Sequence, residues 1–388
     1  MSLVVASETT DFAVDLHDKI TGARSGVMKT AHGVFQTPAF APVATAGSVK
    51  TLLFEEVRSL GAEIVLSNTY HLYLKPGIEV IRQAGGLHRF INWKGPILTD
   101  SGGFQAYRLS EFFDYQEEGV AFRSHWDGSP HFFSPEMVLE IQYVLGSDLI
   151  MPLDFCPPYP ADETLIARSV RATTDWAGRS KSWWESKDRI SHWGKRQFLF
   201  GIIQGSTSPV WRKRSAQELV ELGFDGYALG GLSLGETKEA TFESVGVAVE
   251  QLPSDCLRYL MGMGTPVDLL SGIEQGIDLF DCALPTRNAR NGTVYSWEGK
   301  QVLKGAGFKD DFQPIDERCG CPACRNYTRA YIRHLFNTKE ISAMHLATLH
   351  NLWFYQELLR VAREKIGTGE IAAFKKDLIE RYREEESC

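Results

Sequence analysis

Residues 97–105 read ILTDSGGFQ, a short apolar run that ends on the carboxylate of Asp100 and is followed at once by Ser101, Gly102 and Gly103. The apolar run has the character of a buried strand. Paired glycines allow the backbone to turn sharply, or another group to approach it closely. We therefore expect a strand whose carboxyl end presents Asp100.

The same pattern, a β-branched or aromatic run that stops at Gly, Pro or Asp, recurs along the chain. The expected strands are 35–44, 63–70, 95–102, 148–154, 198–205, 226–232, 258–264 and 279–286. Most of them are continuously apolar, which is typical of strands covered on both faces, as in parallel sheets. Helix-periodic segments separate several of them, so eight βα units predict an α/β fold, the (β/α)8 TIM barrel.

The residues at the carboxyl ends of these strands form a set, and most of them are polar or small. They are Asn68, Asp100, Asp154, Gln204, Gly230, Gly231, Met261 and Asp281. The active site of such barrels lies at the carboxyl-terminal face. One Asp at such a position often only caps the next helix, but three carboxylates beside Gln204 and paired glycines predict a single polar pocket.

Three cysteines, Cys319, Cys321 and Cys324, crowd into the stretch CGCPAC, whereas the other four of the seven stand apart. This spacing favours a metal site over a disulfide framework. A fourth ligand is needed for a tetrahedral zinc site, which would be closed and therefore structural. The candidates are His334, His345, His350 and Cys388; the residues leave this choice open, although two histidines five apart on a helix, about 140° around its axis, cannot both face the ion.

The division of the chain follows from these patterns. We expect an N-terminal β cap of one or two hairpins over 1–34, a barrel core over 35–303, a zinc-binding subdomain over 304–350, and C-terminal helices that complete the barrel over 351–388. A further hairpin is expected within 291–304, with Glu298 and Gly299 at its turn.

The charge of the chain is unevenly distributed. A net charge of -8 over 388 residues argues against a general nucleic-acid surface. Between Ala283 and His334, however, the sequence contains nine basic and five acidic residues, and this local excess predicts a localised polyanion site. No apolar run is long enough for a membrane span and the N-terminus lacks the layout of a signal peptide, so we expect a cytoplasmic protein.

Six motifs carry a resemblance to a known family: LSNTYHL (66–72), LTDSGGFQ (98–105), FGIIQG (200–205), GYALGGLSLGE (226–236), FDCALPTRNARNG (280–292), and CGCPAC (319–324) with HN (350–351). In these motifs and their order the chain resembles the tRNA-guanine transglycosylases, also called queuine tRNA-ribosyltransferases, over nearly its whole length. We expect the bacterial type, without the C-terminal RNA-binding domain of the archaeal enzymes. The resemblance implies a barrel with a zinc subdomain, one structural zinc per chain and His350 as its fourth ligand.

This family exchanges the wobble guanine of tRNAs with a GUN anticodon for a 7-deazaguanine base. By resemblance, Asp281 is the nucleophile that attacks the ribose and releases guanine, which leaves a covalent intermediate between tRNA and enzyme. Asp100 then deprotonates the incoming base. Two displacements at one carbon restore the original configuration. The glycines after Asp100 would leave space for base and ribose.

The resemblance also implies how the base is recognised. Asp154 would accept hydrogen bonds from the guanine-like N1 and exocyclic amine, while Gln204 and the Gly231 amide would donate to O6. Phe104 and Met261 would sandwich the ring, although burial tendencies alone favour ordinary core for both.

Further roles follow by resemblance at the edges of this pocket. The Leu232 carbonyl and Glu236 would address the 7-aminomethyl group, Asn68 would orient Asp100, and Ser101 would belong to the same base-binding set. Arg287 and Arg290, which follow Asp281, would contact the RNA around the target nucleotide. Cys282 is interpreted as packing.

Three positions depart from the family pattern. Phe155 and Thr265 stand where Glu and Lys are often found, and Leu234 is bulky where queuine-using eukaryotic enzymes have Gly. Leu234 therefore favours 7-aminomethyl-7-deazaguanine as the base, with queuine as the alternative.

Two rival functions remain in view, a non-catalytic tRNA-binding accessory subunit and a glycoside hydrolase on the same barrel. The full carboxylate set argues against the first, and the purine-edge pair Asp154 and Gln204 against the second. A homodimer is expected, because Tyr327, Tyr331 and His334 are spaced for one helix face; the same spacing could describe an internal packing face.

Overall fold

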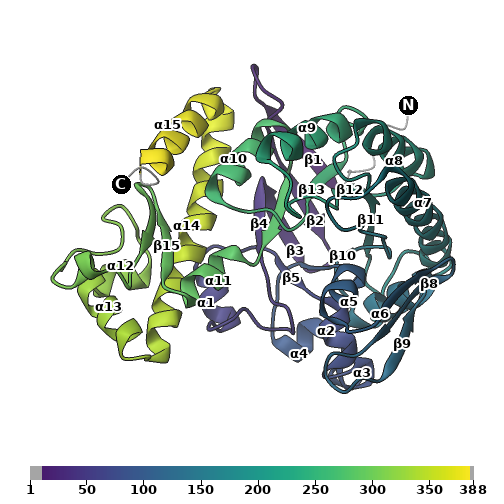
Figure 1. Cartoon of the computed structure of the whole chain (residues 1–388), viewed down its shortest axis with the longest axis horizontal. Coiled ribbons are helices and arrows are strands. Elements are labelled where there is room, and N and C mark those ends of the chain that lie inside the picture. Colours follow the sequence, from purple (N-terminus) through teal and green to yellow (C-terminus); the bar gives the residue numbers. More distant parts are fainter. Residues whose placement is uncertain (1–10, 385–388) are drawn as a thin grey trace, which may run out of the picture.

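A computed structural model describes residues 11–384 of the chain. Eight parallel strands form its centre (Figure 1): β4 (Ala39–Pro42), β5 (Val65–Ser67), β6 (Ile97–Thr99), β10 (Leu149–Ile150), β11 (Phe198–Ile203), β12 (Gly226–Leu229), β13 (Leu257–Leu260) and β14 (Leu279–Cys282). From β5 to β14, neighbours in this order pair with one another, and β14 pairs with β4. A parallel bridge between Val43 and Leu66 joins the two remaining edges. The predicted α/β barrel with its eight strands is therefore confirmed.

The strands are apolar throughout because both of their faces are buried. In β11, the side chains of Phe198, Phe200 and Ile202 belong to the cluster inside the barrel. Leu199 and Ile203, which alternate with them, pack in the larger cluster under the outer helices. Successive side chains of a strand point to opposite faces, and each fully buried Phe or Leu contributes roughly 1.5–3 kcal/mol.

Helices cover the outside of the barrel. They are α1 (Phe54–Ser59), α2 (Thr69–Leu74), α3 (Ile78–Ala84), α4 (Leu87–Ile91), α5 (Gly103–Leu109), α6 (Pro135–Leu145), α7 (Glu163–Glu185), α8 (Pro209–Leu222), α9 (Lys238–Val249), α10 (Pro266–Glu274) and α11 (Leu284–Arg290). Several begin at a side chain that accepts from the first turn, as Ser134 does for α6 and Asp162 for α7.

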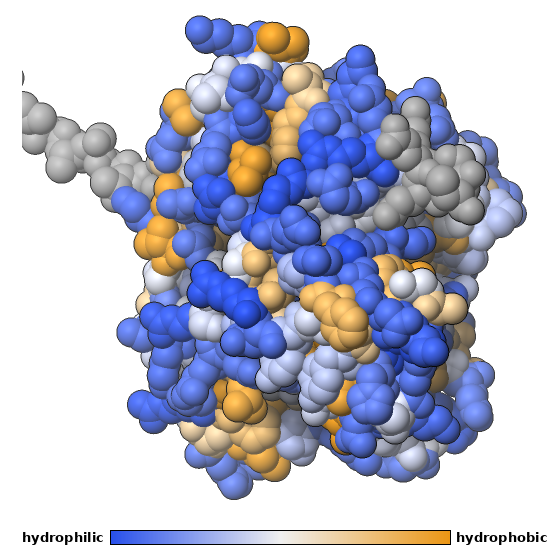
Figure 2. Space-filling view, turned by 90° about the vertical axis from the view of Figure 1, so that its left-hand side faces the viewer, coloured by the Kyte–Doolittle hydropathy of each residue, from blue (hydrophilic) through white to orange (hydrophobic). Residues whose placement is uncertain are grey.

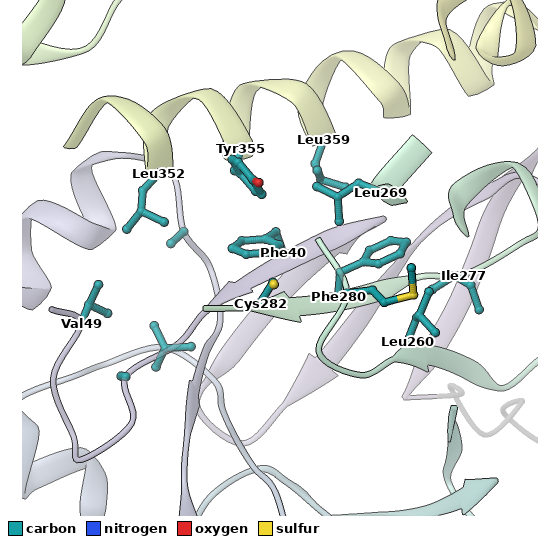
Figure 3. Packing of buried hydrophobic residues seen from close by; sticks show 14 of the residues in the cluster. Phe40, Val49, Leu260, Leu269, Ile277, Phe280, Cys282, Leu352, Tyr355 and Leu359 are labelled. Carbon is teal, nitrogen blue, oxygen red and sulfur yellow. The ribbon is translucent and has the colours of Figure 1, made fainter. Parts of the chain in front are cut away.

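The helix that packs over β4 and β14 comes from much later in the chain. It is α14 (Ile341–Thr368), followed by α15 (Ile371–Glu384). Figure 3 shows Leu352, Tyr355 and Leu359 of α14 pointing at the two strands, and the rings of Tyr355 and Phe40 lie 4.9 Å apart. Cys282 is buried in the same layer, in agreement with a packing role.

An antiparallel sheet covers the amino-terminal end of the barrel, as expected of the N-terminal cap. It consists of β1 (Phe12–His17), β2 (Arg24–Thr30) and β3 (Gly33–Thr37). Arg24 on β2 reaches the buried Asp278, with Nε 2.9 Å from Oδ1. Asp278 lies directly before β14, so this ion pair fixes the cap to the base of a barrel strand.

Three aspartates repeat one arrangement at this end. Each directly precedes a barrel strand. Its carboxylate accepts a hydrogen bond from a backbone N–H at the start of the barrel strand that comes before it in the chain. The pairs are Ile97 N with Asp148 (2.9 Å), Leu199 N with Asp225 (2.9 Å) and Arg258 N with Asp278 (2.8 Å). These carboxylates satisfy strand donors that have no partner in the sheet.

The segment between α5 and α6 forms a sheet that the sequence did not predict. It contains β7 (Phe113–Gln116), β8 (Gly119–Arg123) and β9 (Pro130–Phe133), all antiparallel. Its strands are short, and alternate residues of β7 are exposed. They therefore lack the continuous apolar signal of the barrel strands.

The expected hairpin near residue 300 is present as β15 (Thr293–Ser296) and β16 (Gly299–Val302). Ser296 pairs with Gly299, so the turn residues are Trp297 and Glu298, and the turn predicted at Glu298 and Gly299 was wrong by one position. Gly299 instead begins the second strand.

The metal-ligand region follows this hairpin. It contains η1 (Ala306–Phe308), α12 (Pro322–Asn326) and α13 (Arg329–Asn337), all on one side of the barrel (Figure 1). Among the described helices, none is long and apolar enough to cross a membrane.

Candidate active site and metal centre

Asp100 lies at the carboxyl end of β6 and is held by the segment that follows β5. The Asn68 amide nitrogen donates to its Oδ2 and the Thr69 backbone N–H donates to its Oδ1, at 3.0 Å. Burial, aided by the nearby Asp281 and Asp154, raises the pKa of Asp100 to about 7, although the Thr69 and Asn68 hydrogen bonds oppose the shift. A carboxyl group with this pKa can both give and take a proton near neutral pH.

The glycines after Asp100 serve the packing of the protein itself. Gly102 has φ +78°, and a Cβ there would lie 2.7 Å from the backbone nitrogen of Tyr70. A Cβ on Gly103 would lie 3.2 Å from the carbonyl oxygen of Asp154. The expectation that this space admits base and ribose was wrong, because protein atoms fill it.

Asp154 stands at the centre of a buried polar network. The Ser101 hydroxyl donates to its Oδ1 and the Gln204 amide nitrogen to its Oδ2, both at 2.8 Å. Burial raises the pKa of Asp154, and these two hydrogen bonds partly offset the effect. The Gln204 Oε1 atom is buried without a partner among the described residues.

Gly231 lies directly against Gln204. Its φ is +67°, and a Cβ would lie 2.3 Å from Gln204 Oε1, so only glycine fits here. The structure therefore gathers Ser101, Asp154, Gln204 and Gly231 into one polar corner.

Asp281, near the end of β14, is fixed by one oxygen only. The Tyr259 hydroxyl and the Gly262 backbone N–H both donate to its Oδ1, at 2.6 and 2.8 Å. No described residue donates a hydrogen bond to Oδ2. Burial raises the pKa of Asp281. Burial and the adjacent Asp281 also raise the pKa of Tyr259 well above its ordinary value, so its hydroxyl remains a donor.

Tyr259 is the principal site residue that the sequence did not reveal. It lies inside the apolar strand β13 and is fully buried. A buried tyrosine usually has a hydrogen-bond partner for its hydroxyl, and this was the only signal available. The arrangement orients one carboxylate oxygen and leaves the other free to form a bond.

The other expected base-binding residues line the same face. Phe104 and Met261 are half-buried, Met261 packs against the cluster inside the barrel, and Leu232 is buried. The Glu236 carboxylate accepts hydrogen bonds from the Leu234 backbone N–H at 2.8 Å and from the Thr241 hydroxyl at 2.9 Å. Glu236 thus holds its own loop in shape.

Two departures from the family pattern have local explanations. Phe155 is buried and stacks on Tyr115 of the inserted sheet, with ring centroids 3.4 Å apart. Thr265 is the N-cap of α10, and its hydroxyl accepts from the Asp268 backbone N–H at 3.2 Å. Both side chains are thus explained by contacts within the protein.

Two arginines project from α11, which begins three residues after Asp281. Arg287 is exposed and Arg290 is half-buried. Burial and the neighbouring Arg287 lower the pKa of Arg290, and its Nη1 atom is buried without a partner in the described part of the chain. This free donor is suited to an anionic or carbonyl acceptor.

The three cysteines converge on one histidine. Nδ1 of His350 lies 3.5, 3.8 and 3.2 Å from the sulfur atoms of Cys319, Cys321 and Cys324. Its Nε2 atom lies 2.7 Å from the Tyr295 carbonyl oxygen, which makes Nε2 the protonated nitrogen and directs the Nδ1 lone pair at the thiols. The four ligand atoms can hold one metal ion.

The other candidates for the fourth ligand lie elsewhere. The ring of His345 bonds to the Thr51 carbonyl at 2.9 Å and lies 3.2 Å from Glu56. His334 is exposed on α13 and is not part of the cluster. Cys388 lies outside the described residues.

A second cluster, which the sequence did not predict, lies at the opposite end of the barrel. His32 Nδ1 and His88 Nε2 lie 2.9 and 3.3 Å from the two oxygens of Asp148, and the imidazoles stack 3.5 Å apart. Stacked rings direct their lone pairs side by side rather than at one point. The cluster is therefore best described as two imidazoles in contact with the strand-capping carboxylate of Asp148.

The fold and the site together define an α/β-barrel enzyme with acidic side chains at the carboxyl ends of several strands and a Cys3His cluster beside the barrel. A family model described as queuine tRNA-ribosyltransferase matches residues 18–384. The chain belongs to this family, whose members are tRNA-guanine transglycosylases.

Curated proteins of the same name are similar over almost the whole chain. The protein of Thermoanaerobacter sp. (strain X514) is 51% identical over 365 residues, which cover 94% of this chain and 96% of the relative. That of Pelotomaculum thermopropionicum is 50% identical over 371 residues, covering 96% and 98%. That of Symbiobacterium thermophilum is 49% identical over 365 residues, covering 94% and 90%.

We expect Tyr259→Phe to lower kcat for base exchange by roughly 10- to 100-fold, the worth of a hydrogen bond to a charged group. KM for the RNA should change little, because the tyrosine acts through Asp281. Steady-state kinetics with labelled base would measure both. Loss of RNA affinity at unchanged kcat would contradict a positioning role. Tyr227→Phe, in the neighbouring strand β12, is the matched control.

Proposed function

We propose that this enzyme exchanges guanine at the wobble position of tRNAs with a GUN anticodon for 7-aminomethyl-7-deazaguanine, a step of queuosine biosynthesis. The observation that carries the proposal is that Asp281 and Asp100 are held in different ways. Asp281 is fixed by one oxygen with the other free, and Asp100 has a pKa of about 7. This is the division of labour that double displacement at one carbon needs.

In the first step, the free oxygen of Asp281 attacks C1′ of the target ribose. The bond from C1′ to the base nitrogen breaks, its electron pair leaves with guanine, and a covalent ester joins the RNA to Asp281. Protonated Asp100 supplies the proton that neutralises the departing base. Tyr259 and the Gly262 amide keep the carboxylate aimed at the carbon.

In the second step, ionised Asp100 takes the proton from the ring nitrogen of the incoming base. That nitrogen attacks C1′, and the ester bond to Asp281 breaks with its electron pair returning to the carboxylate. One proton therefore leaves Asp100 with the old base and returns from the new one, and Asp100 ends as it began.

Base selection would rest on the polar corner. Asp154 accepts from the N1 and amine edge, and Gln204 and the Gly231 amide donate to O6. A base that left these buried groups unpaired would be rejected by a large factor. Phe104 and Met261 would enclose the ring. Leu232 and Glu236 would address the aminomethyl group, while Leu234 leaves less room for the larger queuine.

The RNA would enter with its target base unstacked, as single-stranded anticodon loops allow. Arg287 and Arg290 would contact the phosphates or base edges that flank the target. We place the reaction in the cytoplasm, where tRNA is found.

The Cys3His cluster would hold one zinc ion, to which three thiolates and one imidazole are well suited. When bound, zinc supplies a closed structural crosslink. We further propose a homodimer through the face of α12 and α13. Tyr327 and Tyr331 stack there with centroids 5.4 Å apart, are 40% and 44% exposed, and so do not form an internal packing face. Figure 2 shows this side of the molecule as largely hydrophilic, with separate apolar patches.

The central experiment is release of radiolabelled guanine from a GUN-anticodon tRNA, driven by the aminomethyl base or by queuine, with wild type and Asp281→Ala. We expect release by wild type only, and with the aminomethyl base. Release driven equally by queuine would overturn the choice of base. Binding of the tRNA by wild type without any exchange would favour the accessory-subunit alternative.

The pKa of Asp100 predicts a pH dependence. The rate at which base resolves the preformed covalent intermediate should rise with pH as Asp100 ionises, because only ionised Asp100 takes the proton. Its midpoint should lie no higher than about pH 7, because the ester removes the Asp281 charge that helps to raise the pKa of Asp100. Single-turnover measurements between about pH 5 and 9 would cover the range in which a carboxyl group with this raised pKa titrates. Asp100→Asn should be slow and should lack the inflection; an unchanged inflection in this variant would exclude Asp100 as the base.

Metal removal tests the zinc and dimer proposals together. A chelator should strip one zinc per chain, measured by elemental analysis, and convert the dimer into monomers in sedimentation, because the crosslinked subdomain carries the dimer face. The circular dichroism of the barrel should persist. A protein that is monomeric before chelation contradicts the dimer, and a dimer that survives loss of the metal contradicts the crosslink.

A further inference from the structure

We propose that the turn between β8 and β9, together with the end of α2, forms a second RNA-contact patch, in which an unpaired base next to the target nucleotide stacks on Trp126. The patch consists of Lys75, His125 and Trp126, and we call it the hairpin-tip patch. The proposal deepens the proposed function and rests on it.

The hairpin-tip patch lies next to the catalytic carboxylates. His125 Nδ1 is 2.7 Å from the hydroxyl of Tyr70, and the two rings stack 5.5 Å apart. Tyr70 follows Thr69, whose N–H holds Asp100, and the backbone of Tyr70 lies against Gly102. One layer of side chains therefore separates the turn from the Asp100 loop.

The exposed chemistry of the patch is that of a single-strand platform. Trp126 is 55% exposed, and Lys75 Nζ lies 4.0 Å from the centroid of its ring. An aromatic face beside a cation is the pair of groups that binds a base and its phosphate without reading sequence. An isolated exposed Trp would need no explanation, but this one lies beside a cation and is joined through His125 and Tyr70 to the Asp100 loop.

The turn is built to hold Trp126 in place. The Ser124 N–H donates to the Ser129 carbonyl and the Gly128 N–H to the Ser124 carbonyl, both at 2.8 Å, and the Trp126 N–H donates to the Ser124 hydroxyl at 3.2 Å. The Asp127 carboxylate is engaged by the hydroxyl of Ser129 at 2.7 Å. A platform that is rigid before binding loses little entropy when a base stacks on it.

The hairpin-tip patch and α11 lie on different sides of the pocket. Arg287 and Arg290 follow β14, whereas the patch is attached through Tyr70 to the ends of β5 and β6. In the closed barrel, β4 and β5 lie between β14 and β6. An anticodon loop with its target base inside the pocket would thus meet basic residues on both sides.

The test compares Trp126→Ala, Trp126→Phe and Lys75→Ala with wild type in base exchange. Trp126→Ala should raise KM for the tRNA about tenfold, the worth of one base stacked on an aromatic ring, and leave kcat within about twofold. Trp126→Phe keeps a ring and should restore most of the affinity. Lys75→Ala should lower the slope of log KM against log salt by about one, as for the loss of one phosphate contact.

Lys187→Ala is the matched control, because Lys187 lies 5.3 Å from the Trp183 ring in a similar pair next to α7. An unchanged KM in Trp126→Ala overturns the proposal, and so does a fall in kcat alone, which would place the turn in support of Asp100. If wild type exchanges no guanine, the proposed function itself fails. The two failures are therefore distinguishable.

Discussion

Closure of the barrel between β4 and β5 is the constraint on which the site depends. It rests on the bridge between Val43 and Leu66 and on main-chain hydrogen bonds from Ala44 to Leu66 at 2.6 Å and from Asn68 to Thr45 at 3.1 Å. Asn68 takes part twice, because its backbone joins the strands while its side chain holds Asp100. In an open sheet β4 and β5 would form opposite edges, and Asp281 and Asp100 would lie far apart.

The two ends of this barrel treat buried carboxylates differently. At the amino-terminal end Asp278 has Arg24, Asp225 has Arg196 at 3.6 Å, and Asp148 has two histidines. At the other end Asp100, Asp154 and Asp281 are held by neutral donors alone among the described ion pairs and hydrogen bonds. Neutral donors hold a carboxyl group in place without the positive charge that would strongly favour its ionised form. Such a group can therefore still take up and release a proton. The chemistry that we propose therefore lies at the end whose carboxylates have no charged partner among the described residues.

The sequence was informative where burial left a continuous signal. The barrel strands were predictable because both faces are apolar, and Asp100, Gln204 and Asp281 were predictable because a polar residue stands at each strand end. The inserted sheet was not predicted because its strands are short and half-exposed. The role of Tyr259 was not predicted because its hydroxyl is one polar atom inside an apolar run. The choice of His350 over His345 depends on the carbonyls of Tyr295 and Thr51, which are distant in the chain and invisible to helix geometry.

One feature of the fold bears on how the protein is made. The strand β4 ends at Pro42, yet the helix that covers it spans Ile341–Thr368. At 5–20 residues per second, a ribosome takes roughly 15–60 s to reach α14 after finishing β4. During that interval Phe40 and its neighbours have no covering layer (Figure 3). The same helix carries His350, so the nascent barrel acquires its last layer and its fourth metal ligand in the same few seconds of synthesis.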